Sequence, residues 1–308
     1  MLILRMKNDC RAMNKILGVG NATLDIINSV SNYPNEDSEN RANSQRMALG
    51  GNAANSLHVL AQLQHRCSFL GVLAYDAFGH TIKDELKRLN VGTRHCYATQ
   101  GRTPTSYITL NEENASRTIV HYRDLPELHA THFIDEVNIQ KYQWLHFQAR
   151  DNVDELERML QHCRQQGSSQ QRISLEIEKP HDNVERLIHL ADVLFFSKDY
   201  ARHHGFDNAS DLLIASRQWN SSALRVCAWG RKGAFCDAPQ ADKPGFSPIY
   251  HSPAFEPDAV VDTVGAGDTF NAGFIDAQCR GLDLEESLIH ACRLAGKKCG
   301  QVGFDNLV

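Results

Sequence analysis

Short apolar runs alternate with helical patterns along most of this chain. Six runs have the length and composition of buried strands, at residues 16–20, 67–73, 143–147, 173–177, 193–196 and 224–228. In other stretches apolar residues recur at helical spacing, at residues 52–64, 81–89, 266–279 and 284–298. Strands that alternate with helices favour a parallel sheet covered by helices on both faces. The sequence therefore predicts an α/β fold built on a doubly wound, mainly parallel sheet.

Two neighbouring segments interrupt this alternation. Residues 106–110 and 117–121 are rich in β-branched and aromatic side chains and are joined by a polar stretch, which is typical of a β-hairpin. Residues 32–46 are polar and contain Pro34, so we expect an exposed excursion there. No internal repeat or linker composition divides the chain. We therefore predict one domain spanning residues 1–308.

The composition excludes several classes of function. The net charge is -5, so the phosphate backbone of a nucleic acid is not an expected partner. No apolar run approaches the roughly 18 residues of a membrane span, and the apolar start at residues 1–4 is too short for a signal-peptide core. The 9 cysteines are scattered without a CxxC pair, as in proteins of a reducing compartment. We therefore expect a cytoplasmic protein with no nucleic-acid or membrane partner.

The run DTVGAGDTFNAG at residues 262–273 carries the sharpest chemical signal. Gly265, Ala266 and Gly267 let a ligand approach the backbone closely, and a helical pattern begins at the same place. The free N–H groups of such a helix start form an anion site at the positive end of the helix dipole. Asp268 is either a helix cap there or a base that takes a proton from a substrate hydroxyl.

A second polar cluster precedes the first helical pattern. Asn52 and Asn55 stand three residues apart at the helix start, after Gly50 and Gly51, and so face the same side. Together with Asp25 they supply donors and acceptors for vicinal hydroxyls, as a sugar site requires. A helix cap at Asn52 and a turn at Asp25 would explain each residue alone, but not their coincidence with the distant glycine-rich run.

Both runs resemble the two signatures of the PfkB family of carbohydrate kinases, also called the ribokinase family. The resemblance implies a ribokinase-like fold, ATP and Mg²⁺ as cofactors, and phosphoryl transfer with Asp268 as the base. Phosphoryl transfer needs mainly an in-line nucleophile and charge stabilisation, which one carboxylate and an anion hole can provide. The resemblance also allows a potassium ion near the C-terminal loops.

Further segments resemble the fructose-phosphorylating members of this family, at residues 33–39, 44–46, 176–180, 197–199 and 295–305. The match runs from about residue 16 to residue 308. It implies ATP-dependent conversion of D-fructose to D-fructose 1-phosphate, a small β-sheet lid formed by segments of about 26–48 and 103–122, and a homodimer that pairs two such lids.

The resemblance also assigns residues to the two substrates. The positions that match sugar-contacting residues are Asp25, Asp37, Gly51, Asn52, Asn55 and Asp268. The positions that match nucleotide-contacting residues are Arg117, Gly230, Arg231, Lys232, Gly233, Gly265, Ala266 and Gly267. One member of this group carries acidic residues in place of Arg231 and Lys232, a departure that bears on nucleotide affinity. The stretch at 197–200 departs from the Asn-x-x-Glu motif of many relatives, so the metal ligands stay unassigned.

Three alternatives remain. Gly18 and Gly20 follow the first predicted strand as in a dinucleotide-dependent oxidoreductase, but Thr23 occupies the place of that fingerprint's third glycine. A non-catalytic sugar or nucleotide sensor on the same fold would typically lack the base or the anion hole. Within the family, a kinase of ribose, adenosine or another ketose would share the same two signatures.

Overall fold

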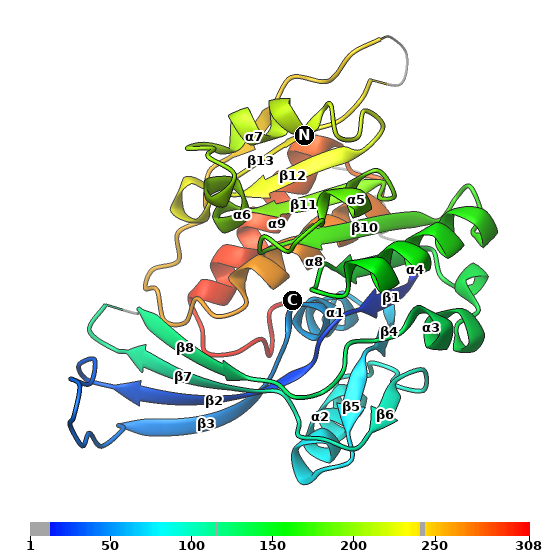
Figure 1. Cartoon of the computed structure of the whole chain (residues 1–308). Helices are drawn as coiled ribbons and strands as arrows, with labels where there is room; N and C mark the ends of the chain where they lie inside the picture. Colours follow the sequence, from blue (N-terminus) through cyan, green and yellow to red (C-terminus); the bar gives the residue numbers. More distant parts are fainter. Residues whose placement is uncertain (1–12, 115, 241–243) are drawn as a thin grey trace, which may run out of the picture.

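The computed structural model describes residues 13–114, 116–240 and 244–308, and it centres on one eight-stranded sheet (Figure 1). In spatial order the strands are β14 (Tyr250–Ser252), β13 (Ala234–Asp237), β12 (Leu224–Ala228), β11 (Val193–Ser197), β10 (Arg172–Ile177), β9 (Trp144–Gln148), β1 (Lys15–Val19) and β4 (Arg66–Leu70). The strands from β4 to β12 pair in parallel, and β13 and β14 extend the sheet antiparallel. The predicted mainly parallel sheet is confirmed.

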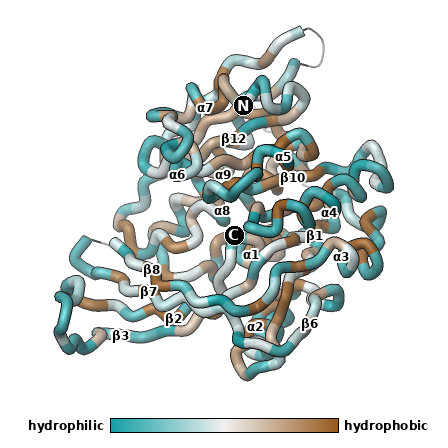
Figure 2. The backbone as a smooth tube through the Cα atoms, in the orientation of Figure 1, coloured by the Kyte–Doolittle hydropathy of each residue, from teal (hydrophilic) through white to brown (hydrophobic). Residues whose placement is uncertain are grey.

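Helices cover both faces of this sheet, because successive strand residues point to opposite sides. Ile16 packs in a core with three helices, α1 (Asn52–Gln62), α8 (Ala266–Cys279) and α9 (Leu284–Cys299). Leu17 packs on the other face with α3 (Ala130–Glu136), α4 (Val153–Gln166), α5 (Glu185–Ile188), α6 (Lys198–His203) and α7 (Ala209–Ser216). In Figure 2 inner strands such as β10 have the hydrophobic colour, whereas much of α4 and α6 at the surface has the hydrophilic colour. The doubly wound arrangement is therefore confirmed.

Two predicted elements have wrong boundaries. The run at 67–73 is not one strand: it divides into β4 and β5 (Val72–Ala74), and β5 pairs with β6 (Tyr97–Thr99) in a separate two-stranded sheet. The predicted helix at 81–89 begins earlier, as α2 (Ala77–Arg88). Asp76 causes the early start, because its Oδ1 accepts a hydrogen bond from the Gly79 N–H at 2.7 Å and caps the helix.

A four-stranded sheet projects from the main body, at the lower left of Figure 1. Its order is β3 (Ser44–Gly50), β2 (Thr23–Val30), β7 (Thr105–Asn111) and β8 (Arg117–Tyr122). The predicted hairpin is confirmed as β7 and β8. The expected excursion at 32–46 is wrong at its end, since residues 44–46 already belong to β3. β3 pairs with β2 along its whole length, so backbone pairing rather than an apolar pattern forms this strand.

Candidate active site

The candidate site lies where β1 and β10 end and α8 begins. After β1 the chain enters β2 and returns through β3 to α1, so it forms no strand-to-helix turn after Gly20. That path excludes the dinucleotide fingerprint, which requires a helix directly after the first strand. Ligands of open α/β sheets bind beyond the carboxyl ends of the strands. Here the same edge gathers side chains from β2, α1, β10 and α8.

Asp268 is buried in the first turn of α8 and is held in place by α1. The Asn55 side-chain amide donates to Asp268 Oδ2 at 2.7 Å, and the Ser56 hydroxyl donates to the Asp268 carbonyl at 3.2 Å. Burial raises the pKa of Asp268 well above its usual range, the charge of Glu176 raises it further, and the Asn55 hydrogen bond opposes both. The arrangement provides an oriented carboxylate with increased affinity for a proton.

The helix start itself is built on Gly265. This residue is the N-cap of α8 with φ 75°, and a Cβ there would lie 2.1 Å from the Phe304 ring. Asp268 is therefore inside the helix, and the alternative that it caps the helix is wrong. At Gly267 a Cβ would meet no atom within 4 Å, so the backbone of the first turn is open to a ligand. Its N–H groups can hold an anion beside the Asp268 carboxylate.

Asn52 bridges two further carboxylates, whose charges act on Asp268. Its amide donates to Glu176 Oε1 and to Glu178 Oε2, each at 3.0 Å. Glu176 is the next-to-last residue of β10, and its Oε2 is buried without a hydrogen-bond partner in the described part of the chain. The sequence interpretation did not include Glu176 in the site. A charged residue inside an otherwise apolar strand is the signal that could have identified it.

Asp25 lies on β2 and faces Gly50, the last residue of β3. It is 7% exposed, its Oδ1 accepts from the Thr23 hydroxyl at 2.9 Å, and burial raises its pKa, against the lowering effect of that hydrogen bond. A Cβ at Gly50 would lie 2.3 Å from the Asp25 carboxylate, so only glycine fits beside it. The charge of Asp25 also contributes to the raised pKa of Asp268. These carboxylates therefore share one electrostatic environment.

Asp262 is the centre of a buried network in front of the glycine-rich run. The Lys298 ammonium lies 3.0 Å from Asp262 Oδ2 and donates to the Asp262 carbonyl at 2.8 Å. The Arg46 guanidinium reaches the same Oδ2 at 2.9 Å, and the Val264 N–H donates to Oδ1 at 2.9 Å. Burial alone would raise the pKa of Asp262, but the Lys298 charge and the hydrogen bonds lower it. The network fixes the loop that leads into the anion site.

Two arginines connect the four-stranded sheet to this loop. Arg46 comes from β3, and Arg117, the first residue of β8, donates to the Thr263 hydroxyl at 2.8 Å. Thr263 stands two residues before Gly265, so this contact holds the Arg117 guanidinium near the anion site. Since Lys298 and Arg46 already occupy the Asp262 carboxylate, this carboxylate does not fit a potassium ion.

Other residues assigned by resemblance lie apart from this cluster. Asp37 is exposed in the connection between β2 and β3, at the outer end of the four-stranded sheet (Figure 1). Gly230, Arg231 and Lys232 form the short turn η2 (Gly230–Lys232) directly after β12. The turn follows the carboxyl end of a parallel strand, so it lies at the same edge of the sheet as Asp268. Arg231 and Lys232 are both exposed there.

No group of three or more metal-ligating side chains occurs among residues 13–114, 116–240 and 244–308. Glu176 and Glu178 nonetheless fit a hard cation that is bound mainly by phosphates and water. Both are carboxylates beside Asp268, and the buried Glu176 Oε2 has an unused lone pair.

The 8 cysteines in the described residues have free thiols, and Cys10 lies outside those residues. No helix in the described part of the chain is long and apolar enough to span a membrane.

The charge of Glu176 leads to a prediction about pH dependence. Glu176→Gln removes a negative charge near Asp268 and should lower the pKa of that carboxyl. A base must be deprotonated to act, so the acid limb of the profile of kcat/KM against pH should move to lower pH. Glu185→Gln is the control, because the Glu185 side chain is 51% exposed on α5 and should leave the profile unchanged. An acid limb that stays in place in Glu176→Gln would contradict the electrostatic coupling.

Comparisons with known proteins identify the family of the chain. Residues 13–307 match the model of the pfkB family carbohydrate kinases. Mouse ketohexokinase is 40% identical over 96% of this chain and 99% of its own length. A nucleoside kinase of Methanocaldococcus jannaschii is 26% identical over 94% of this chain and 88% of its own length.

Solved structures agree on the fold. Giardia lamblia ribokinase aligns with a TM-score of 0.77 at 17% identity, over 96% of each chain. Arabidopsis thaliana ribokinase, in complex with ribose and ATP, aligns with a TM-score of 0.76 at 20% identity, over 94% of each chain. At such low identity these likenesses establish the ribokinase-like fold alone. The family model matches nearly the whole chain, and one relative is 40% identical over almost its full length. This chain therefore belongs to the pfkB family of carbohydrate kinases.

Proposed function

We propose that this sugar kinase transfers the γ-phosphoryl group of ATP to D-fructose and forms D-fructose 1-phosphate and ADP. The observation that carries the proposal is the buried Asp268 carboxylate at the open helix start, oriented by the Asn55 amide at 2.7 Å. The choice of a ketohexose rests on the 40% identity to mouse ketohexokinase over nearly the full length of both chains.

In the proposed reaction the sugar hydroxyls bind to Asp25, Asn52 and Asn55. Asp268 accepts the proton of the reacting hydroxyl, whose oxygen forms a bond to the γ-phosphorus as the bond to the ADP oxygen breaks. The N–H groups of the first turn of α8 stabilise the charge on the transferred group. Arg117, held at the neighbouring Thr263, supports the phosphates, and the turn from Gly230 to Gly233 borders the nucleotide.

Magnesium is the proposed metal, held mainly by the ATP phosphates and water, with Glu176 and Glu178 beside it. When bound, it neutralises charge on the β- and γ-phosphate oxygens. No residue is proposed as a potassium ligand, since the carboxylate of Asp262 is occupied by two cationic side chains.

We further propose that the four-stranded sheet is a lid over the sugar and the contact surface of a homodimer. Large apolar side chains stand about half exposed on it: Met47 53%, Tyr107 50%, Ile119 49%, Val120 66% and Tyr122 47%. Such a surface favours burial against a second copy. Asp37, at the outer end of this sheet, would then come near the partner. Light scattering should give a mass of twice 34.6 kDa, and a mass of one chain would exclude the dimer.

A coupled assay with ATP and a panel of sugars tests the proposed reaction. We expect the highest kcat/KM with D-fructose among fructose, ribose and adenosine, and NMR of the product should place the phosphate on O1. Faster turnover of ribose or adenosine would move the enzyme to another activity of the same family. Binding of sugar and nucleotide without turnover would instead indicate the non-catalytic sensor.

A further inference from the structure

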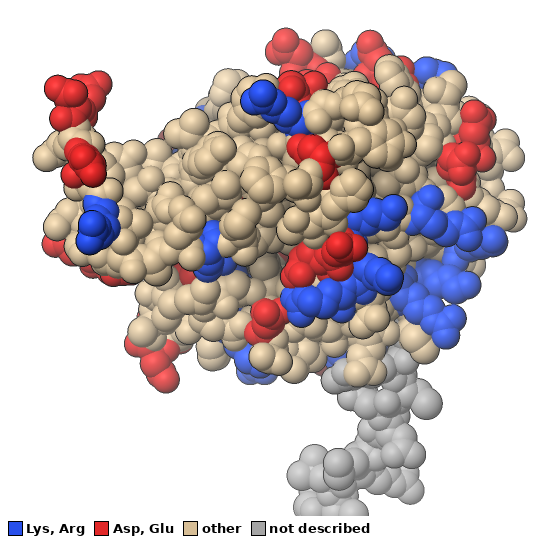
Figure 3. Space-filling view, turned by 90° about the horizontal axis from the view of Figure 1, so that it is seen from below, with Lys and Arg blue, Asp and Glu red and all other residues tan. Residues whose placement is uncertain are grey.

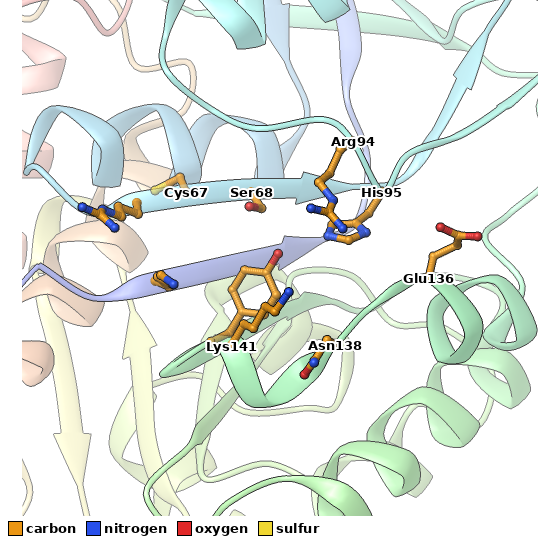
Figure 4. A pocket seen from close by; sticks show the side chains of 10 residues that line it. Cys67, Ser68, Arg94, His95, Glu136, Asn138 and Lys141 are labelled. Carbon is orange, nitrogen blue, oxygen red and sulfur yellow. The ribbon is translucent and has the colours of Figure 1, made fainter.

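A second region of the molecule has the features of a ligand site and shares no residue with the active site. A cavity of about 260 Å³ is lined by Lys15, the first residue of β1, and by Arg66, Cys67 and Ser68 of β4. Figure 4 shows Arg94 and His95 near the arrowheads of the two strands, Glu136 beyond the arrowheads, and Asn138 and Lys141 below the strands. The active site is formed by side chains of β2, α1, β10 and α8, and none of these elements lines the cavity.

The charge of this cavity is unbalanced. Lys15, Arg66, Arg94 and Lys141 line it, and Glu136 is its one carboxylate. Within residues 13–114, 116–240 and 244–308, none of these four cations takes part in an ion pair, although 20 such contacts occur elsewhere. Figure 3 shows lysine and arginine side chains gathered at the right of the face seen from below, with acidic side chains beside them. Unpaired like charges around a hollow repel one another and create a positive potential.

Neutral groups in the lining add donors to this potential. The Ser68 hydroxyl and the Asn138 amide border the same space, and His95 is only 7% exposed. Burial lowers the pKa of His95 and the charge of Arg94 lowers it further, against the raising effect of the Glu136 charge, and this lowered pKa favours the neutral ring. The cavity therefore combines permanent positive charge with uncharged hydrogen-bonding groups.

We propose that this cavity binds a small phosphate monoester as a second ligand, separate from the sugar and ATP. The planar guanidinium groups of Arg66 and Arg94 suit the oxygens of a phosphate, and a dianion balances much of the excess positive charge. The volume of about 260 Å³ admits a compact metabolite rather than a folded chain. The net charge of -5 for the whole protein makes a nucleic-acid backbone the less suitable source of phosphate.

Isothermal titration tests this proposal, with glycerol 3-phosphate as the probe and the active site saturated with fructose, Mg²⁺ and a non-hydrolysable ATP analogue. The wild type should bind one equivalent of glycerol 3-phosphate and should bind inorganic phosphate more weakly. Arg66→Gln with Arg94→Gln should weaken binding about tenfold, since two charge contacts are lost. The matched control is Arg202→Gln with Arg293→Gln, two exposed arginines on α6 and α9, which should bind the probe as the wild type does.

Glu136→Gln tests whether the bound ligand is an anion. Removing the one carboxylate of the lining should tighten binding of the probe a few-fold, because a like charge is taken away from an anion. Unchanged kcat in all of these variants would show that the fold and the active site are intact. Absence of binding to the saturated wild type, an equal loss in the control pair, or weaker binding in Glu136→Gln would each overturn the proposal.

Discussion

Asp268→Asn is expected to reduce kcat by about 10²-fold or more, the usual scale for loss of a general base. The asparagine keeps the size of the side chain and can still contact the Asn55 side chain, so the pocket keeps its shape. Only the capacity to accept the proton of the sugar hydroxyl is lost. The KM values for sugar and ATP should therefore change much less than kcat, as steady-state assays can measure.

The same substitution should stabilise the protein at neutral pH. The pKa of Asp268 is raised in the folded state, mainly by burial, so folding favours its protonated form. The contribution of such a group to stability is present below its unfolded pKa and is lost as the pH rises through the folded pKa. A neutral amide avoids that loss. The Tm of Asp268→Asn should exceed that of the wild type at pH 7, and the difference should shrink as the pH approaches 4.

Asp276 offers a matched control on the same helix. It is also buried, but the His290 ring 2.9 Å from its carboxylate, the hydrogen bond with His65 and the charge of Arg280 outweigh burial and lower its pKa. Its stabilising contribution is present above the unfolded pKa, so Asp276→Asn should lower the Tm at pH 7. Near-normal kcat in Asp268→Asn would remove this residue from the role of base. A Tm that falls equally in both variants would contradict the opposite signs of the two pKa shifts.

Local patterns allowed most of the main sheet to be predicted. Apolar runs such as 193–196 become strands because they are buried on both faces, and this requirement is visible in the composition of each run alone. The strands of the projecting sheet were harder to predict. β3 has an exposed, polar first half, and β2 combines buried and half-buried residues, so their pairing with each other decides their structure.

The candidate site, like the fold, could be predicted from the sequence only in part. The glycine-rich run and the two asparagines were identified from local spacing, and the structure joins Asn55 to Asp268 across 213 positions of sequence. The Asp262 network could not be predicted in the same way, because Arg46, Asp262 and Lys298 come from three distant segments. One signal was available for Lys298: it follows Leu294 by four residues and Ala291 by seven, and therefore lies on the buried side of α9.

Lys298→Met is expected to lower the free energy of unfolding by about 3–5 kcal/mol, the usual cost of removing one partner of a buried ion pair. The Lys298 side chain is fully buried, and its ammonium contacts both the carboxylate and the carbonyl of Asp262. Methionine fills a similar volume but leaves the carboxylate with Arg46 as its one remaining cation. Chemical denaturation at pH 7 measures the loss.

Lys297→Met is the matched control for this prediction, because Lys297 is the preceding residue of α9 and is exposed, with one hydrogen bond to the Leu307 carbonyl at 2.8 Å. Its loss should cost about 1 kcal/mol.

In Lys298→Met the pKa of Asp262 should rise, because a cation that lowers it is gone. A buried carboxylate with a raised pKa destabilises the folded state above that pKa. The loss of unfolding free energy in Lys298→Met relative to the wild type should therefore be largest at neutral pH and become smaller as the pH falls. Since Asp262 fixes the loop before the anion site, the KM for ATP should also rise in Lys298→Met but not in Lys297→Met. Equal losses of stability in the two variants would show that the Lys298–Asp262 pair does not hold this loop.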